Sequence, residues 1–372
     1  MPGTAPVVYT SGQMRTAAKI RVCLSSCLPA VFLLAFAAGL VSPAPQAGAQ
    51  GTLEAGKLVI YSIDVEGGQA TLFVSPSKAS LLVDTGWPGN NGRDAGRIQA
   101  AMKDAGITRI DHLLITHFHV DHVGGIAQLA ERVPIGEFLD HGTNREDSDI
   151  TRHDFGVYEK VTAGKNRRTV HPGDTIDIPG LTTIVLAADG DHIDAIPGVT
   201  PKPNPYCATE PKAEADPTEN AYSAGILMTF GRFRLLDLGD LTKAKEIALV
   251  CPNNPIPPVD LYIVTHHGFN LSNSRAIVDA IHPRVAIMNN GAHKAGSPEA
   301  WQTVHDSPGI EDLYMVHTAE DSDAAHNSPE ALIANPKGSG VDGAYFKVVA
   351  GQDGSFSVFN SRTGMTKDYA RK

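Results

Sequence analysis

Three histidines and one aspartate lie within six residues, between His117 and His122. Imidazole nitrogens and carboxylate oxygens are the ligands that zinc and similar divalent ions prefer. His117 and His119 are two residues apart, so an extended backbone points both side chains the same way. Asp121 and His122 follow at a turn, from which they can reach a second ion. The spacing therefore predicts a metal centre at this point of the chain.

The surrounding pattern of strands and helices indicates an α/β or α+β fold, with the cluster at the end of a buried strand. Strands are expected over residues 58–63, 70–75, 79–83, 113–116, 137–140, 182–186, 223–230, 232–237, 261–265, 285–288, 344–349 and 356–359. Helices are expected over residues 93–103, 121–132, 152–162, 242–250, 272–281 and 298–305. Two long polar stretches, residues 196–219 and 321–343, are expected to form loops.

The first 49 residues have the features of a secretory signal peptide. Three basic residues precede an apolar run over residues 28–41, and Ala47 and Ala49 frame a small-x-small cleavage pattern. The run is shorter than the ~20 residues of a membrane-spanning helix, although a membrane anchor is the alternative interpretation. We therefore expect an exported chain, periplasmic or secreted, in which residues 50–372 form one domain without a transmembrane span.

The composition of residues 50–372 bears on the partner and on the redox compartment. This part holds 28 basic and 41 acidic residues, a formal charge of −13, which argues against nucleic acid as the main substrate. A small molecule is expected instead. Cys207 and Cys251 are the cysteines of this part, and in an exported protein they most simply form one disulfide. Two inert thiols are the alternative. The sequence does not indicate the oligomeric state.

The cluster resembles the His-x-His-x-Asp-His signature of the metallo-β-lactamase superfamily. The resemblance extends over about residues 57–320 and implies a four-layer αβ/βα sandwich with the metal site along one edge. It also implies that His117 and His119 bind one metal ion, and that Asp121 and His122 bind the other. Zinc is the expected metal, as one or two ions, although manganese and iron also suit such ligands.

Further positions match motifs of this superfamily in the same chain order. Asp84, in Leu-Leu-Val-Asp-Thr-Gly, matches an acidic residue expected to orient metal-binding histidines. Asp240, in Leu-Asp-Leu-Gly-Asp, matches the carboxylate that bridges both ions. His266 and His267 match the last ligand motif, and we expect His266 to bind the second metal and His267 to lie close to the substrate. A turn role for Asp84 and a helix-capping role for Asp240 are the alternatives.

The superfamily's usual middle histidine has no counterpart here, and Asn220 lies in that region. His192, 48 residues before Asp240, is a second candidate for completing the site of His117 and His119. The metal at these two histidines is therefore expected to have an incomplete or unusual set of ligands.

In this respect the sequence resembles one subgroup of the superfamily. The run Asp-Val-Glu-Gly-Gly-Gln at residues 64–69, the stretch from Asn220 to Ser223 and the His-His-Gly at residues 266–268 are similar to two kinds of protein. These are the hydrolase domain of DNA-uptake competence proteins and the phosphorylcholine esterases. The resemblance implies hydrolysis of phosphoester or phosphodiester bonds by a metal-activated hydroxide.

Several side chains are expected to take part in the reaction. Asp121 or Asp240 would accept a proton from the attacking water, and His267, His141 or Lys294 would assist the leaving group. Weaker candidates for contact with the substrate are Asn220, His141, Asn290 and Lys294. The alternative for each is an ordinary loop or turn role.

Three functional hypotheses follow. The first is an exported metal-dependent hydrolase of phosphoesters or phosphodiesters. The second is an enzyme that opens a cyclic ester or amide, such as a lactone or a β-lactam, although the absent middle histidine counts against it. The third is a non-catalytic metal-bound binding protein, which the incomplete ligand set motivates. The fold alone does not identify the substrate.

Overall fold

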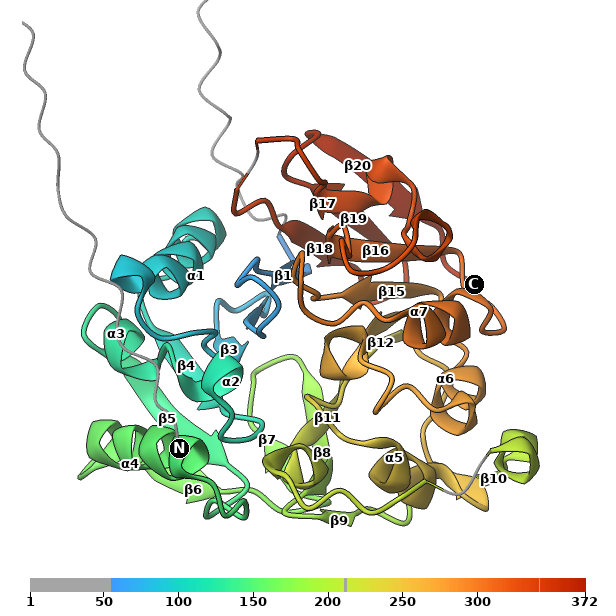
Figure 1. Cartoon of the computed structure of the whole chain (residues 1–372), viewed down its shortest axis with the longest axis horizontal. Helices are drawn as coiled ribbons and strands as arrows, with labels where there is room; N and C mark the ends of the chain where they lie inside the picture. The colour runs from blue at the N-terminus through green and yellow to red at the C-terminus, as the bar shows by residue number, and fades with distance from the viewer. Residues whose placement is uncertain (1–54, 211–212, 341) are drawn as a thin grey trace, which may run out of the picture. The chain divides into compact units, whose positions relative to one another are not determined.

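The computed structural model describes residues 55–210, 213–340 and 342–372 (Figure 1). The predicted signal peptide, residues 1–49, lies outside the described residues. Among the described residues, no helix combines the length and the apolar character needed to cross a membrane.

The first of two large sheets is built from both ends of the described chain. Its nine strands run in the order β20-β19-β18-β1-β2-β3-β4-β5-β6. β3, β4, β5 and β6 pair in parallel, and the remaining neighbours pair antiparallel. The strand bounds are β1 Leu58–Ser62, β2 Thr71–Val74, β3 Ser80–Val83, β4 Ile110–Leu114, β5 Ile135–Asp140, β6 Arg167–Thr169, β18 Phe346–Ala350, β19 Phe356–Asn360 and β20 Met365–Tyr369.

The second sheet also has nine strands, in the order β17-β16-β15-β14-β12-β11-β8-β7, with β9 paired to β8. The strands from β12 to β17 pair in parallel, so their carboxyl ends meet along one edge. The strand bounds are β7 Thr175–Ile176, β8 Thr182–Ala188, β9 Asp191–His192, β11 Gly225–Phe230, β12 Phe233–Asp237, β14 Leu261–Ile263, β15 Val285–Met288, β16 Asp312–His317 and β17 Ile333–Asn335. A separate pair joins β10 (Lys202–Pro203) to β13 (Asn253–Asn254).

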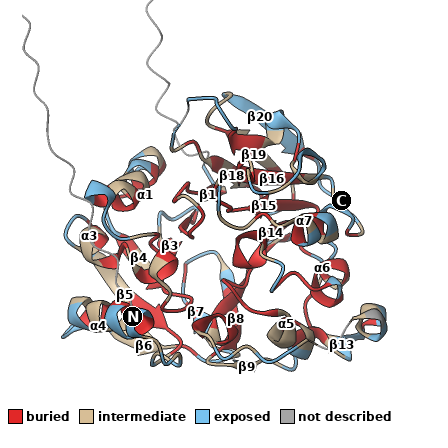
Figure 2. Ribbon diagram, viewed as in Figure 1, coloured by how far each residue is buried: buried red, intermediate tan, exposed pale blue. Residues whose placement is uncertain are grey.

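Helices cover the outer face of each sheet, and the two inner faces share one apolar core (Figures 1 and 2). Successive strand residues point to opposite faces. Leu114 of β4 therefore packs in the core between the sheets, whereas Leu113 packs under the helices. The helices over the first sheet are α1 Arg93–Ala105, α3 Ile126–Ala130 and α4 Asp149–Thr162, and those over the second are α5 Lys243–Val250, α6 Arg275–Ile281 and α7 Pro298–His305. The predicted αβ/βα sandwich is confirmed.

The prediction of one continuous helix over residues 121–132 is wrong. The segment is divided into α2 (Val120–Val123) and α3 (Ile126–Ala130). The break lies at two glycines, and a Cβ on Gly125 would stand 2.1 Å from the carbonyl oxygen of Thr85. Close backbone contact at this point therefore requires glycine. The strands β16 and β20 and the short strands β6, β7, β9, β10, β13 and β17 were not predicted, and β17 lies in the segment 321–343 that was expected to be a loop.

A disulfide joins Cys207 to Cys251, which confirms the predicted pairing. Cys207 lies in the short helix η2 (Pro205–Thr209), and Cys251 follows α5 directly. The bond anchors the long segment after β9 to the helical layer over the second sheet. That segment, expected to be a plain loop, also holds β10 and η2.

Candidate metal centre

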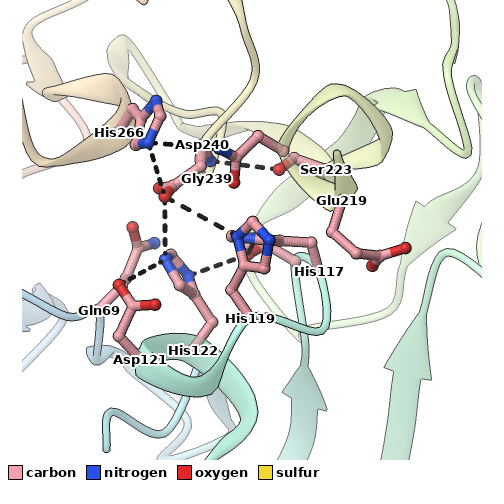
Figure 3. Close-up of polar contacts among 12 residues, drawn as sticks. Gln69, His117, His119, Asp121, His122, Glu219, Ser223, Gly239, Asp240 and His266 are labelled. Atoms are coloured by element: carbon pink, nitrogen blue, oxygen red, sulfur yellow. Dashed lines mark hydrogen bonds and ion pairs between the residues drawn. The ribbon is translucent and has the colours of Figure 1, made fainter. Parts of the chain in front are cut away.

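Four buried side chains bring their donor atoms together at the edge where strands of both sheets end. Donor atoms of Asp121, His122, Asp240 and His267 all lie within 4.8 Å of one another. Asp121 and His122 belong to α2, Asp240 follows β12, and His267 lies in the short helix η4 (Thr265–Gly268) after β14. In Figure 3 the carboxylate of Asp240 lies between His122 and the neighbouring histidines.

The orientation of His122 shows that this group suits a cation. Its Nδ1 lies 2.7 Å from Oδ2 of Asp84, which fixes the proton on Nδ1 and turns Nε2 inward. That Nε2 is 3.2 Å from Oδ2 of Asp240 and 3.1 Å from Nε2 of His267. Lone pairs and carboxylates therefore converge on one point, an arrangement that a divalent cation neutralises.

The electrostatics of the group agree with this geometry. Burial by itself lowers the pKa of His122, but the carboxylates of Asp240, Asp121 and Asp84 raise it well above the ordinary value. The site thus favours positive charge at its centre strongly enough to overcome desolvation. Oδ1 of Asp240 is buried and has no hydrogen-bond partner among the described residues, so it is free to bind an ion.

His117 and His119 form an adjoining pair of nitrogen donors. Nε2 of His117 lies 3.0 Å from Nδ1 of His119 and 3.9 Å from Oδ2 of Asp240. Nε2 of His119 contacts Oε2 of Glu146 at 2.9 Å, which leaves Nδ1 facing His117. Burial, followed by the neighbouring His122 and His119, holds the pKa of His117 well below its ordinary value, so its ring is neutral and can bind a metal.

Asp240 is the carboxylate that approaches this pair from the donor group of His122 and His267, and the other compact donor group of the described residues is formed by Asp64, Glu66 and His317. His192 lies in the edge strand β9 and belongs to neither group. Asn220 belongs to neither group and lies beside His266.

The two adjacent histidines of η4 were expected to lie with His266 at the metal and His267 near the substrate. The structure instead places His267 in the donor group and His266 outside it. His267 belongs to the four-residue donor group, with Nε2 3.2 Å from Oδ2 of Asp121. His266 lies at the rim, where its Nδ1 is 3.1 Å from Oγ of Ser272 and its Nε2 is 3.5 Å from Oδ2 of Asp240. Both residues have a positive φ, 56° and 53°, a strained conformation that clusters at functional sites.

The four weaker substrate candidates divide into two pairs. Nδ2 of Asn220 lies 3.4 Å from Nε2 of His266, and Lys294 Nζ contacts the carboxylate of Asp121. By contrast, Asn290 is buried and donates to the carbonyl oxygens of Gly291 and His317. His141 is also buried, with Nε2 2.9 Å from Oε2 of Glu219. The structure therefore brings Asn220 and Lys294 to the metal cluster and gives Asn290 and His141 internal partners.

Sequence reasoning missed several acidic and amide side chains that hold the ligands in place. The buried carboxylate of Glu219 accepts a hydrogen bond from the backbone N–H of Phe118, at 3.0 Å, within the histidine cluster. Glu219 directly precedes Asn220, but a single glutamate carries no local pattern, and its partner is 101 residues away.

Gln69 connects the metal cluster to a buried acid. Its Nε2 donates to both carboxylate oxygens of Asp237, at 3.0 and 2.9 Å, and its backbone N–H donates to the carbonyl of Asp121. Burial raises the pKa of Asp237 to about 6. The Gln69 side chain therefore stabilises a buried carboxylate that is not a member of the donor group.

Solved structures with related folds include YhfI from Bacillus subtilis, a metallo-beta-lactamase fold protein. It has 13% identity and a TM-score of 0.42, over 69% of this chain and 96% of that one. A diphosphatase of the PhnP family has 13% identity and a TM-score of 0.39, over 69% of this chain and 94% of the other.

Two curated proteins resemble part of the sequence. Atrochrysone carboxyl ACP thioesterase of Passalora fulva is 28% identical over 127 residues, 34% of this chain and 32% of its own. Hydroxyacylglutathione hydrolase of Rhodopseudomonas palustris (strain BisB5) is 30% identical over 103 residues, 28% of this chain and 34% of its own. The chain thus matches about a third of the length of each relative.

Residues 63–201 match the sequence model of the metallo-beta-lactamase superfamily. The matched segment includes the cluster from His117 to His122, whose side chains converge with Asp240 and His267 in a cation-binding arrangement. Residues 63–201 therefore carry the sequence features of a metallo-beta-lactamase superfamily domain.

Proposed function

We propose that the protein is an exported hydrolase that cleaves phosphoester or phosphodiester bonds of small molecules. The observation that carries the proposal is the position of Lys294, whose Nζ contacts the carboxylate of Asp121 at the metal cluster. Nζ also donates to the carbonyl oxygen of Gly67 at 2.6 Å and lies 5.0 Å from the ring centroid of Trp87. A fixed cation beside a metal site suits a substrate whose reacting group is an anion.

The proposed metal ligands follow the geometry of the site. His122, Asp240, His267 and Asp121 would hold one ion, and His117 with His119 would hold a second that shares Asp240. When bound, such ions lower the pKa of water to about 7 and polarise the oxygen under attack. We propose zinc, because imidazole and carboxylate are its usual ligands, with manganese and iron as alternatives.

The side chains of the site have separate proposed roles. Lys294 would bind a non-bridging oxygen of the phosphate and offset the charge that develops in the transition state. Asp121 or Asp240 would accept a proton from water. His266, at the rim beside Asn220, would contact the leaving group of the substrate.

Export is supported by two features of the chain. The first 49 residues have the composition of a signal peptide, and the Cys207–Cys251 bond is of a kind that persists in oxidising compartments. We therefore propose a periplasmic or secreted location.

A second candidate is hydrolysis of an acyl compound. The similarity to the Passalora fulva thioesterase and to hydroxyacylglutathione hydrolase favours it, and Lys294 could equally bind a substrate carboxylate. The two candidates differ in the atom attacked, phosphorus or carbonyl carbon, so the same purified protein can test both.

The test is a panel of chromogenic substrates with the zinc-loaded protein: a phosphodiester, a phosphomonoester, a thioester, a lactone and a cephalosporin. We expect turnover of the phosphoesters at least tenfold above that of the acyl compounds, and its loss in Asp121→Asn. The exposed Asp177→Asn serves as the matched control and should retain activity. Preference for the thioester would replace the first proposal by the second, and full activity of Asp121→Asn would overturn the site assignment.

A further inference from the structure

A pocket of about 370 Å³ lies beside the metal cluster, between the segment 213–218 and the start of α5. Asn220 lines the pocket and also contacts His266, whose Nε2 is 3.5 Å from the carboxylate of Asp240. Thr242, another lining residue, follows Asp240 by two positions. The pocket is therefore separated from the donor group by the side chains of Asn220 and His266.

Three buried side-chain oxygens of the lining residues have no hydrogen-bond partner among the described residues. They are Oγ1 of Thr218, Oδ1 of Asn220 and Oγ1 of Thr242, and the residues Asn220 and Thr242 are only 7% and 3% exposed. Thr242 is the N-cap residue of α5, yet its side chain makes no capping hydrogen bond. A buried polar atom without a partner is costly, so these oxygens point to hydrogen bonds that a ligand supplies.

The outer part of the pocket is mainly apolar. Ala213, Ala215, Pro217, Ala244 and Leu271 line it. Leu271 is 58% exposed, one of the three large apolar side chains that are most exposed among the described residues. An exposed leucine on the wall of a pocket is well placed to cover an apolar ligand.

The charged lining residues of the pocket argue against a second anionic group in it. They are Glu214, Asp216 and Lys243, so the wall carries two carboxylates and one ammonium group. One carboxylate oxygen of Asp216 already accepts the backbone N–H of Thr218. A nucleotide or another polyanion would meet no excess of positive charge here.

We propose that this pocket is the subsite for the organic substituent of the substrate, and that this substituent is an uncharged, predominantly apolar chain. The proposal rests on the proposed function for the head group, which the metal cluster and Lys294 would bind. Asn220 and Thr242 hydrogen-bond the polar link next to the head group, and Leu271 with the alanine-rich wall covers the chain. The substrate class is thus a phosphoester of an alkyl or acyl-bearing compound.

Binding of non-hydrolysable ligands tests the subsite without turnover. Isothermal titration of the zinc-loaded full chain would compare methylphosphonate with hexylphosphonate, and acetate with heptanoate. Each buried methylene group adds about fourfold in affinity. We expect hexylphosphonate to bind at least tenfold more tightly than methylphosphonate.

Variants of residues that line the pocket test whether the preference for hexylphosphonate arises there. Leu271→Ser should weaken hexylphosphonate binding about fourfold to tenfold, and Ala244→Trp, which fills the pocket, should abolish the preference. Neither should change the affinity for methylphosphonate. Ile150→Ser is the matched control, because Ile150 is 66% exposed and lies in α4, away from the pocket. An equal loss in Ile150→Ser would overturn the assignment to this pocket.

The design separates failure of the subsite from failure of the proposed function. Equal affinity for short and long chains with both head groups would overturn the subsite. A preference for heptanoate over acetate, without binding of either phosphonate, would support the subsite and contradict the phosphoester function. Preference for the long chain with phosphonates supports both.

Discussion

The carboxylate of Asp84 and Nδ1 of His122 lie 2.7 Å apart, and both side chains are fully buried. Oδ1 of the same carboxylate accepts the backbone N–H of Thr116, and Oδ2 accepts its hydroxyl. Asp84 has a positive φ of 61°, so the backbone accepts strain to hold the carboxylate in this place. Asp84 thus fixes the tautomer of His122 and the end of β4 together.

Replacement of Asp84 by asparagine should weaken metal binding 10- to 100-fold, the usual effect of losing the partner of a metal-binding histidine. The amide cannot hold the Nδ1 proton as a carboxylate does. Competition with a chromogenic chelator would measure the affinity. Asp279→Asn, a buried acid in α6, is the control; unchanged affinity in Asp84→Asn would contradict the role given to Asp84.

The two histidines of η4 should differ in their effect on metal content. His267→Ala removes a member of the donor group and should lower the bound metal by up to one ion per chain. His266→Ala should keep the metal and lose activity. Elemental analysis after dialysis, combined with kcat on the preferred substrate, separates the two effects. Normal metal content in His267→Ala with depletion in His266→Ala would restore the assignment expected from the sequence.

Removal of the Lys294 ammonium group should weaken substrate binding without weakening metal binding. Lys294→Met frees the carboxylate of Asp121, so metal affinity should stay the same or rise, whereas KM for a phosphodiester should rise about tenfold. Lys337→Met, at an exposed lysine, is the control. Reduced metal affinity with unchanged KM would show that Lys294 supports the cluster without binding substrate.

Glu246 gives a prediction about stability and pH. Its buried carboxylate accepts the backbone N–H groups of Asn273 and Ser274, and burial raises its pKa from 4.5 to about 7. Between these values the folded chain holds a proton that the unfolded chain releases, so the contribution of Glu246 to stability falls as pH rises through this window.

The free energy of unfolding of the wild type, relative to Glu246→Gln, should therefore fall by roughly 2–3 kcal/mol between pH 5 and pH 8. Urea unfolding at both pH values would measure it. The exposed Glu299→Gln should show no such difference. A relative stability that rises with pH would contradict the prediction.

Loss of the disulfide should destabilise the domain. Cys207 and Cys251 are 44 residues apart, and closing a loop of this length constrains the unfolded chain by about 2–4 kcal/mol. The double variant Cys207→Ser with Cys251→Ser should lower the free energy of unfolding by this amount. Dithiothreitol should lower the wild-type midpoint equally and leave the double variant unchanged. A midpoint insensitive to reductant in both proteins would contradict the prediction.

Local patterns in the sequence were sufficient for much of the fold and for the centre of the site. The cluster from His117 to His122 could be predicted because all its donors lie within six consecutive residues, directly after an apolar strand. The alternation of apolar strands with helices likewise indicated the layered sandwich. Strand β20 could not be predicted because four of its five residues are exposed and carry no apolar alternation.

The tertiary structure decided which distant side chains complete the site. Lys294 and Asp121 are 173 residues apart, and Phe118 and Glu219 are 101 apart. The placement of His267, and not of His266, in the donor group could not be read from two adjacent histidines in the sequence, and both have a left-handed backbone in η4. Sequence spacing determines contacts along one strand or helix, whereas contacts between segments depend on which strand ends the two sheets bring to a common edge.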